Sequence, residues 1–212
     1  MRKKLISEFA GTYFLIFAGT GAIVIDGMTG SLSHVGIAAT FGLVVMALIY
    51  SFGHISGAHF NPAVTIGFWI RRDITVKDAA LYILVQLLAA ISASGTLILL
   101  FGNVRDLGAT TPSGSWGQSF VLEFILTFFL MLVILCSAIH GKATKAFAGL
   151  AIGATVGLEA LFAGPISGAS MNPARSIGPA LLSGNMQFLW IYVAATFLGS
   201  VAAAWLYSHI HE

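Results

Sequence analysis

The hydrophobic and polar residues of this chain are separated into long blocks, with charged residues in short clusters and apolar stretches between them. A helix needs about 20 mainly apolar residues to cross the roughly 30 Å hydrocarbon core of a membrane. Six apolar stretches are long enough, and we expect each to form one crossing. They lie near residues 5–25, 34–54, 79–104, 118–140, 146–163 and 187–208.

Two intervals without Asp, Glu, Lys or Arg, residues 27–70 and 176–211, are too long for one crossing and too short for two. We interpret each as one crossing joined to a short helix, near 61–70 and 172–183. A helix of about ten residues is about 15 Å long and reaches only the middle of the bilayer. The pattern therefore predicts an all-α membrane protein with six transmembrane helices and two re-entrant half-helices.

The chain also contains an internal repeat. Glu8 lies near the start of the first crossing of the first half, and Glu123 near the start of the first crossing of the second half. Residues 53–63 also resemble residues 163–174. Because each half holds three crossings, an odd number, the second half must enter the membrane with inverted topology. We expect one domain over residues 1–212, with inverted halves at about 1–104 and 118–212. Inverted repeats place their shared functional site near the middle of the bilayer.

The composition agrees with a membrane protein, since 58% of the residues are hydrophobic and only 8% are charged. A soluble domain carries about 25% charged residues. The formal charge of +2 leaves no basic surface for nucleic acid, and the single cysteine excludes an internal disulfide or a Cys-based zinc site. No nucleophile–base spacing or metal-ligand cluster is recognisable, so we expect neither an enzyme nor a cofactor.

The positive charges predict the orientation, because Lys and Arg in short loops are retained on the cytoplasmic side. With six crossings, eight of the ten Lys and Arg residues fall on one side: Arg2, Lys3, Lys4, Arg71, Arg72, Lys77, Lys142 and Lys145. Only Arg105 and Arg175 fall on the other side. We therefore expect a multi-pass protein of the cell membrane with both termini in the cytoplasm.

Each short helix begins at an Asn-Pro-Ala sequence, where Asn61 and Asn172 are preferred N-caps and proline suits the first helical position. Because the halves are inverted, the two helices should meet at their N-termini, which carry positive dipole ends. The asparagine side-chain oxygens are expected to accept from their own helices, and the NH₂ groups to point into a lumen. The extended Ser-Gly-Ala stretches before them need a water-filled cavity for their carbonyl groups, which predicts a pore.

The sequences Gly-His-Ile-Ser-Gly-Ala-His-Phe-Asn-Pro-Ala-Val-Thr and Ser-Gly-Ala-Ser-Met-Asn-Pro-Ala-Arg-Ser, with the two glutamates, resemble the aquaporin family, the major intrinsic proteins, over the whole chain. The resemblance implies a passive channel that conducts water through the lipid bilayer, excludes protons and ions, and forms a homotetramer. It assigns the pore motifs to Asn61, Pro62, Ala63, Asn172, Pro173 and Ala174, a backbone carbonyl ladder to Gly57, Ala58, His59, Gly168, Ala169 and Ser170, and support of the re-entrant loops to Glu8 and Glu123.

The resemblance also places a selectivity filter at Phe41, Ala160, Ala169 and Arg175. An isolated charge inside a membrane segment, such as Arg175, is by itself a candidate functional residue, and its guanidinium can donate to a solute and repel cations. Strict water channels of the family usually carry histidine where Ala160 stands, whereas Ser176 resembles the water-channel choice. We therefore expect water to pass, with glycerol and other small neutral solutes as candidate additions.

Two alternatives remain open. One is a facilitator whose main solute is glycerol or another small neutral molecule. The other is a coupled secondary transporter, which shares the inverted-repeat plan and would need coupling sites among Glu8, Glu123 and Glu159. Glu159 has no partner in the repeat; it could face loop backbone, solvent at the mouth, or act on Arg175 indirectly. Saturable, ion-dependent flux would identify the transporter.

Overall fold

The computed structural model describes residues 1–211, and among these residues it contains helices and no strand. Six helices are long and apolar enough to cross a membrane. They are α1 (Arg2–Thr29), α2 (Ser33–Ser56), α4 (Val76–Phe101), α5 (Trp116–Ile134, continued by a π-helical stretch at Leu135–Ile139), α6 (Ala148–Ser167) and α8 (Leu189–His211). Two short helices, α3 (Pro62–Ile70) and α7 (Pro173–Ser183), complete the predicted fold class, which is confirmed.

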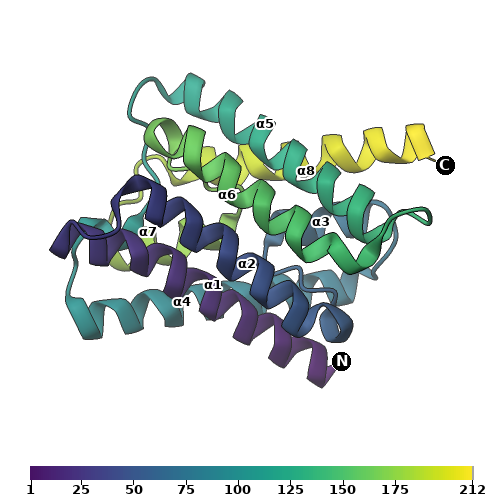
Figure 1. The fold of residues 1–212 in the computed structure, drawn as a ribbon, viewed down its shortest axis with the longest axis horizontal. Helices are drawn as coiled ribbons and strands as arrows, with labels where there is room; N and C mark the ends of the chain where they lie inside the picture. Colours follow the sequence, from purple (N-terminus) through teal and green to yellow (C-terminus); the bar gives the residue numbers. More distant parts are fainter. Residues whose placement is uncertain (212) are drawn as a thin grey trace.

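The long helices run side by side as a bundle, and the start of α1 and the end of α8 lie at the same end of it (Figure 1). The most extensive helix contacts join α5 to α8, α2 to α6, and α1 to α4. The short helices connect the two halves, because α3 packs against α8 and α7 packs against α4. Each half-helix is therefore held by a long helix of the other half.

The contact between α2 and α6 is close because glycines meet there. A Cβ atom on Gly42 would lie 2.7 Å from the carbonyl oxygen of Gly153 and 3.0 Å from the Cα of Gly157. Small residues at such a contact let two membrane helices approach until their backbones touch. Gly153 and Gly157, four residues apart in α6, thus fix the position of this helix against α2.

Gly153→Ala is expected to lower the stability of the folded channel by about 1–3 kcal/mol, the usual penalty for overpacking a close contact. The added Cβ would lie 2.6 Å from Met46 Cβ and 2.7 Å from the Gly42 oxygen. Gly157→Ala is the matched control, because its nearest neighbour, Gly42 Cα, is 3.5 Å away. Thermal unfolding in detergent measures both, and equal midpoints for the two variants would contradict the close contact.

Helix α6 is longer than the sequence indicated, since it continues through Pro165 to Ser167 instead of ending near residue 163. Proline lacks the N–H that would bond to the carbonyl oxygen of Leu161. In its place, His34 Nε2 lies 2.6 Å from that oxygen. A carbonyl only accepts, so His34 is the donor, and it satisfies the group that the proline leaves free. The segment expected to be extended is correspondingly shorter.

Candidate functional site

The two re-entrant turns have the same unusual backbone conformation. Helices α2 and α6 end at Ser56 and Ser167, so only residues 57–61 and 168–172 are non-helical, and the two serines expected in the extended stretches belong to helices. In both turns the first, second and fourth residues have positive φ: Gly57 88°, Ala58 52° and Phe60 50°, and Gly168 85°, Ala169 43° and Met171 55°. Left-handed backbone costs about 1–2 kcal/mol per non-glycine residue, so other interactions must hold these turns.

In the first half, the carboxylate of Glu8 holds the turn from inside α1. Its Oε1 accepts from Ser56 Oγ at 2.7 Å and from the backbone N–H of His59 at 3.0 Å. Its Oε2 accepts from the backbone N–H of Phe60 at 2.8 Å and from Gln86 Nε2 at 2.9 Å. The fully buried carboxylate thus offsets the backbone strain with four hydrogen bonds.

Glu123 of α5 does the same in the second half. Its Oε1 accepts from Ser167 Oγ at 2.7 Å and from the backbone N–H of Ser170 at 2.8 Å. Its Oε2 accepts from the same Ser170 N–H at 3.1 Å and from the backbone N–H of Met171 at 2.9 Å. Both glutamates therefore contact the loop backbone, the arrangement expected of loop-supporting residues.

The two asparagines meet where α3 and α7 begin. The side-chain oxygens of Asn61 and Asn172 accept from the backbone N–H two residues further on, at 2.8 and 3.0 Å. Their Nδ2 atoms cross to the opposite half: Asn61 donates to the carbonyl oxygen of Met171 at 2.8 Å, and Asn172 to that of Phe60 at 2.9 Å. The expectation that the whole NH₂ group points into the lumen is wrong in part, because one N–H of each asparagine links the halves. One N–H of each is left for a solute.

Arg175 is almost fully buried, at 3% exposure, and its guanidinium is held on two sides. One terminal nitrogen donates to the carbonyl oxygen of Gly108 at 2.6 Å. The guanidinium carbon lies 5.0 Å from the centre of the Phe41 ring. The Phe41 ring packs against Gly19 of α1, and a Cβ atom on Gly19 would lie 2.2 Å from the nearest ring carbon. The arginine and the phenylalanine are thus fixed facing each other.

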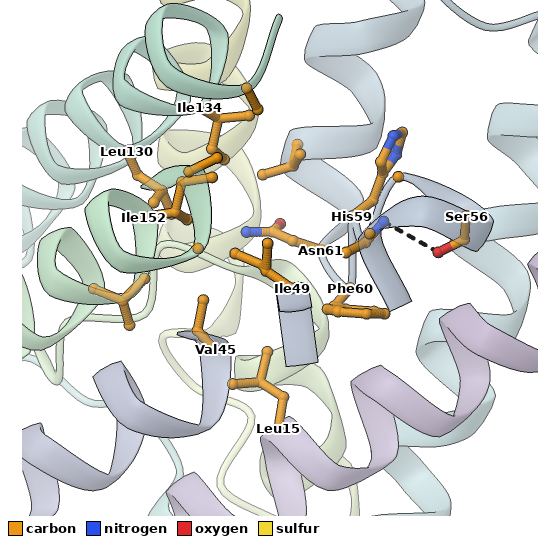
Figure 2. A pocket seen from close by; sticks show the side chains of 18 of the residues that line it. Leu15, Val45, Ile49, Ser56, His59, Phe60, Asn61, Leu130, Ile134 and Ile152 are labelled. Carbon is orange, nitrogen blue, oxygen red and sulfur yellow. Dashed lines mark hydrogen bonds between the residues drawn. The ribbon is translucent and has the colours of Figure 1, made fainter. Parts of the chain in front are cut away.

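Two cavities meet at this pair. The larger has a volume of about 870 Å³ and contains both asparagines in its wall. Figure 2 shows Asn61 beside the apolar side chains of Leu130, Ile134 and Ile152, which surround the same space. The smaller cavity has a volume of about 310 Å³. Three residues line both cavities, namely Phe41, Ala169 and Arg175.

The structure brings most of the predicted site residues to these cavities. Those in the wall of the larger cavity are Gly57, Ala58, His59, Asn61, Ser170 and Asn172, and those in the wall of the smaller one only are Ala160 and Gly168. The residues that are buried and line neither cavity are Pro62, Ala63, Pro173, Ala174, Glu8 and Glu123. Residues 1–211 contain no group of three or more side chains that could hold a metal ion.

Sequence reasoning missed several residues that hold the site. Ser56 and Ser167 occupy matching places in the two repeats, so the repeat itself could have identified them as site residues. Gln86 is the only amide in α4, whereas nothing in the sequence marks the carbonyl group of Gly108. Glu159 is buried at 4% exposure, and no hydrogen bond joins it to loop backbone among the described residues. It therefore makes no hydrogen bond to loop backbone and is not exposed to solvent.

The family model described as "Major intrinsic protein" matches residues 1–207. The chain belongs to this family. Aquaporin NIP1-1 of Oryza sativa subsp. japonica is 50% identical to it over 210 residues, 98% of this chain and 74% of that protein. Nodulin-26 of Glycine max is 49% identical over 208 residues, 97% of this chain and 77% of that protein. The resemblance based on the two motifs is confirmed.

Among solved structures, the aquaglyceroporin from Plasmodium falciparum is similar to this chain, with a TM-score of 0.86 and 29% identity. The similarity covers 98% of this chain and 96% of that one. As a major intrinsic protein with six long apolar helices, the chain is a multi-pass membrane protein, and members of its family are channels for water and small neutral solutes.

Proposed function

We propose that this major intrinsic protein conducts water and small neutral solutes, glycerol included, through a pore that joins the two cavities and excludes protons and ions. The observation that carries the proposal is that Phe41, Ala169 and Arg175 line both cavities. Residues shared by two cavities lie where the cavities meet, which supports placing the constriction of the path at this group. Ala160 completes its wall on the side of the smaller cavity.

The chemistry of this constriction suits a small solute that has hydroxyl groups on one side and an apolar carbon backbone on the other. The guanidinium of Arg175 can donate to a solute oxygen, while the Phe41 ring opposite it presents an apolar surface. Ala160 and Ala169 are small, so they leave room beside the arginine. The buried positive charge repels cations and hydronium, which supports exclusion of ions by the same group that orients the solute.

The paired asparagines act further along the path. In each asparagine, one side-chain N–H donates to the other half and the second N–H does not. Both side chains line the larger cavity. A water molecule there accepts from asparagine and donates to the carbonyl groups of the re-entrant turns. The positive N-terminal ends of α3 and α7 converge at the same place and oppose a passing cation or proton.

The proposal includes an arrangement in the cell membrane. Both termini lie in the cytoplasm, supported by the eight Lys and Arg residues at that end. The chain is one domain of two inverted halves, about 1–104 and 118–212, supported by the matching turns and glutamates. A homotetramer with one pore per chain follows from the family resemblance. Cross-linking in native membranes tests the tetramer, and a monomer as the largest product would contradict it.

A flux assay separates the channel from a coupled transporter. Purified protein in liposomes should let water out at a rate proportional to the osmotic gradient, without saturation and with no requirement for a sodium or proton gradient. Saturable, ion-dependent solute flux without rapid osmotic shrinkage would overturn the proposal. Empty liposomes prepared in parallel give the background rate.

Ala160→His is expected to reduce glycerol permeability relative to water permeability by about tenfold, equivalent to about 1.4 kcal/mol of added barrier. The imidazole would fill the space beside Arg175 that Ala160 leaves open. Ala160→Gly is the matched control and should retain glycerol flux, because it removes volume. Glycerol flux indifferent to the histidine would show that residue 160 is not part of the filter. Stopped-flow light scattering of proteoliposomes measures both permeabilities.

A further inference from the structure

The inverted repeat allows each residue of α4 to be matched with one of α8. Gly67 of α3 packs against Ser200 of α8, and Gly178 of α7 packs against Ala90 of α4. Because Gly67 and Gly178 hold the same position after their asparagines, Ala90 and Ser200 are counterparts. The two long helices are therefore related by a shift of 110 positions.

By the same shift, Tyr82 corresponds to Tyr192 and Gln86 to Thr196. In the first half both side chains are fully engaged with protein. The Tyr82 hydroxyl donates to the carbonyl oxygen of Ser56 at 2.8 Å. The Gln86 amide donates to Glu8 Oε2 at 2.9 Å and to the hydroxyl oxygen of a threonine in α3 at 3.0 Å.

In the second half these interactions are not made. Thr196 is shorter than glutamine, and its hydroxyl donates to its own helix, to the carbonyl oxygen of Tyr192 at 2.6 Å. The Tyr192 side chain is fully buried, yet its hydroxyl has no hydrogen-bond partner among the described residues. Glu123 Oε2 accepts only from backbone N–H groups, whereas Glu8 Oε2 also accepts from a side-chain amide.

A third polar atom belongs to the same region. The Nε of Arg175 is buried and has no hydrogen-bond partner among residues 1–211, although the guanidinium donates elsewhere to Gly108. In the first half the Tyr82 hydroxyl lies on Ser56, whose own hydroxyl donates to Glu8. The repeat therefore places Tyr192 beside Ser167, which donates to Glu123, and α7, which carries Arg175, packs against α8. Buried donors and acceptors without partners are unfavourable, and in native proteins such groups are usually satisfied by an ordered water.

We propose that a buried water molecule is bound in the second half between Glu123, Arg175 and Tyr192, where the first half has the amide of Gln86. The water accepts from Arg175 Nε–H, donates to Glu123 Oε2 and exchanges a hydrogen bond with the Tyr192 hydroxyl. Three polar partners from three different helices are the usual number for a buried water. The water lies behind the pore wall and is separate from the conducted water.

This site also positions Arg175, a consequence that rests on the proposed role of Arg175 in the filter. The guanidinium is held by Gly108 through one terminal nitrogen and by the ring of Phe41. A water on Nε adds a third constraint and connects the arginine to Glu123, which supports the re-entrant turn. The filter and the turn are then coupled through one solvent molecule.

An experimental structure at a resolution that shows single waters tests the site itself. We expect density within hydrogen-bonding distance of the Tyr192 hydroxyl in the unsubstituted channel. In Thr196→Gln, the amide should replace this density and the thermal midpoint should stay equal or rise. Thr196→Val, which adds no amide, should keep the water. No density at this place in the unsubstituted channel would overturn the site, and so would density that persists beside the amide in Thr196→Gln.

The positioning role is tested by permeability. Tyr192→Phe should raise the ratio of glycerol to water permeability, because the water that restrains Arg175 loses a partner. Tyr82→Phe is the matched control in the first half, where no filter arginine is present, and its ratio should be unchanged. Equal ratios for the two variants would overturn the positioning role. Absence of any flux through the unsubstituted protein would instead overturn the proposed function, while the density would still decide the water site.

Discussion

Glu123→Gln is expected to destabilise the protein by about 2–5 kcal/mol and to abolish most of its water permeability. The carboxylate accepts from one serine hydroxyl and from the backbone N–H groups of Ser170 and Met171. A glutamine side chain must turn its NH₂ group toward one set of these donors, which leaves buried donors unpaired. The second re-entrant turn, which holds left-handed Ala169 and Met171, then loses its support.

Glu159→Gln is the matched control for this prediction. Glu159 is a buried glutamate of the same half, but its buried carboxyl oxygen has no hydrogen-bond partner among the described residues. The amide should therefore be tolerated without loss of stability. Thermal unfolding in detergent and osmotic shrinkage of proteoliposomes measure both variants. If the two substitutions lowered the midpoint equally, the effect would come from burial of a carboxyl group and not from support of the turn.

Arg175→Ala is expected to raise glycerol permeability relative to water by about tenfold and to weaken the rejection of cations. A hydrogen bond from a charged donor is worth about 1.5–3 kcal/mol, and 1.4 kcal/mol corresponds to a factor of ten. Removing the guanidinium also widens the place where the two cavities meet. Glycerol re-swelling and a potassium-sensitive dye in the same liposomes measure the two effects.

Arg105→Ala provides the comparison, because Arg105 carries the same charge and lines only the smaller cavity. Its removal should leave the ratio of glycerol to water permeability unchanged. If both variants changed this ratio to the same extent, general charge at the mouth would set selectivity. If neither did, Arg175 would have no role in the filter.

The number and order of the helices could be predicted from the sequence because the bilayer sets their lengths. Apolar runs with at most one charged residue gave the six crossings, and Asn-Pro-Ala gave the starts of both half-helices, where Asn61 and Asn172 are the observed N-caps. The ends were less predictable. Helix α1 continues past Asp26 to Thr29, because the Asp26 side chain bonds to backbone N–H groups at the start of α2.

The shape of the site depended on contacts that no local pattern encodes. Nothing in the sequence indicates that Phe60 and Met171 adopt left-handed backbone, since neither residue type favours it. The exchange of asparagine hydrogen bonds between the halves joins residues more than one hundred positions apart. The continuation of α6 past Pro165 depends on His34, which comes from another helix. Such long-range pairs are visible only in the folded molecule.

The measurement that tests the central claim most directly is stopped-flow light scattering of proteoliposomes under two gradients. An impermeant osmolyte reports water efflux as shrinkage, and glycerol reports solute entry as re-swelling. We predict that both processes are fast and depend on the protein, because Ala160 and Ala169 leave room beside Arg175. Fast shrinkage without protein-dependent re-swelling would contradict a constriction wide enough for glycerol.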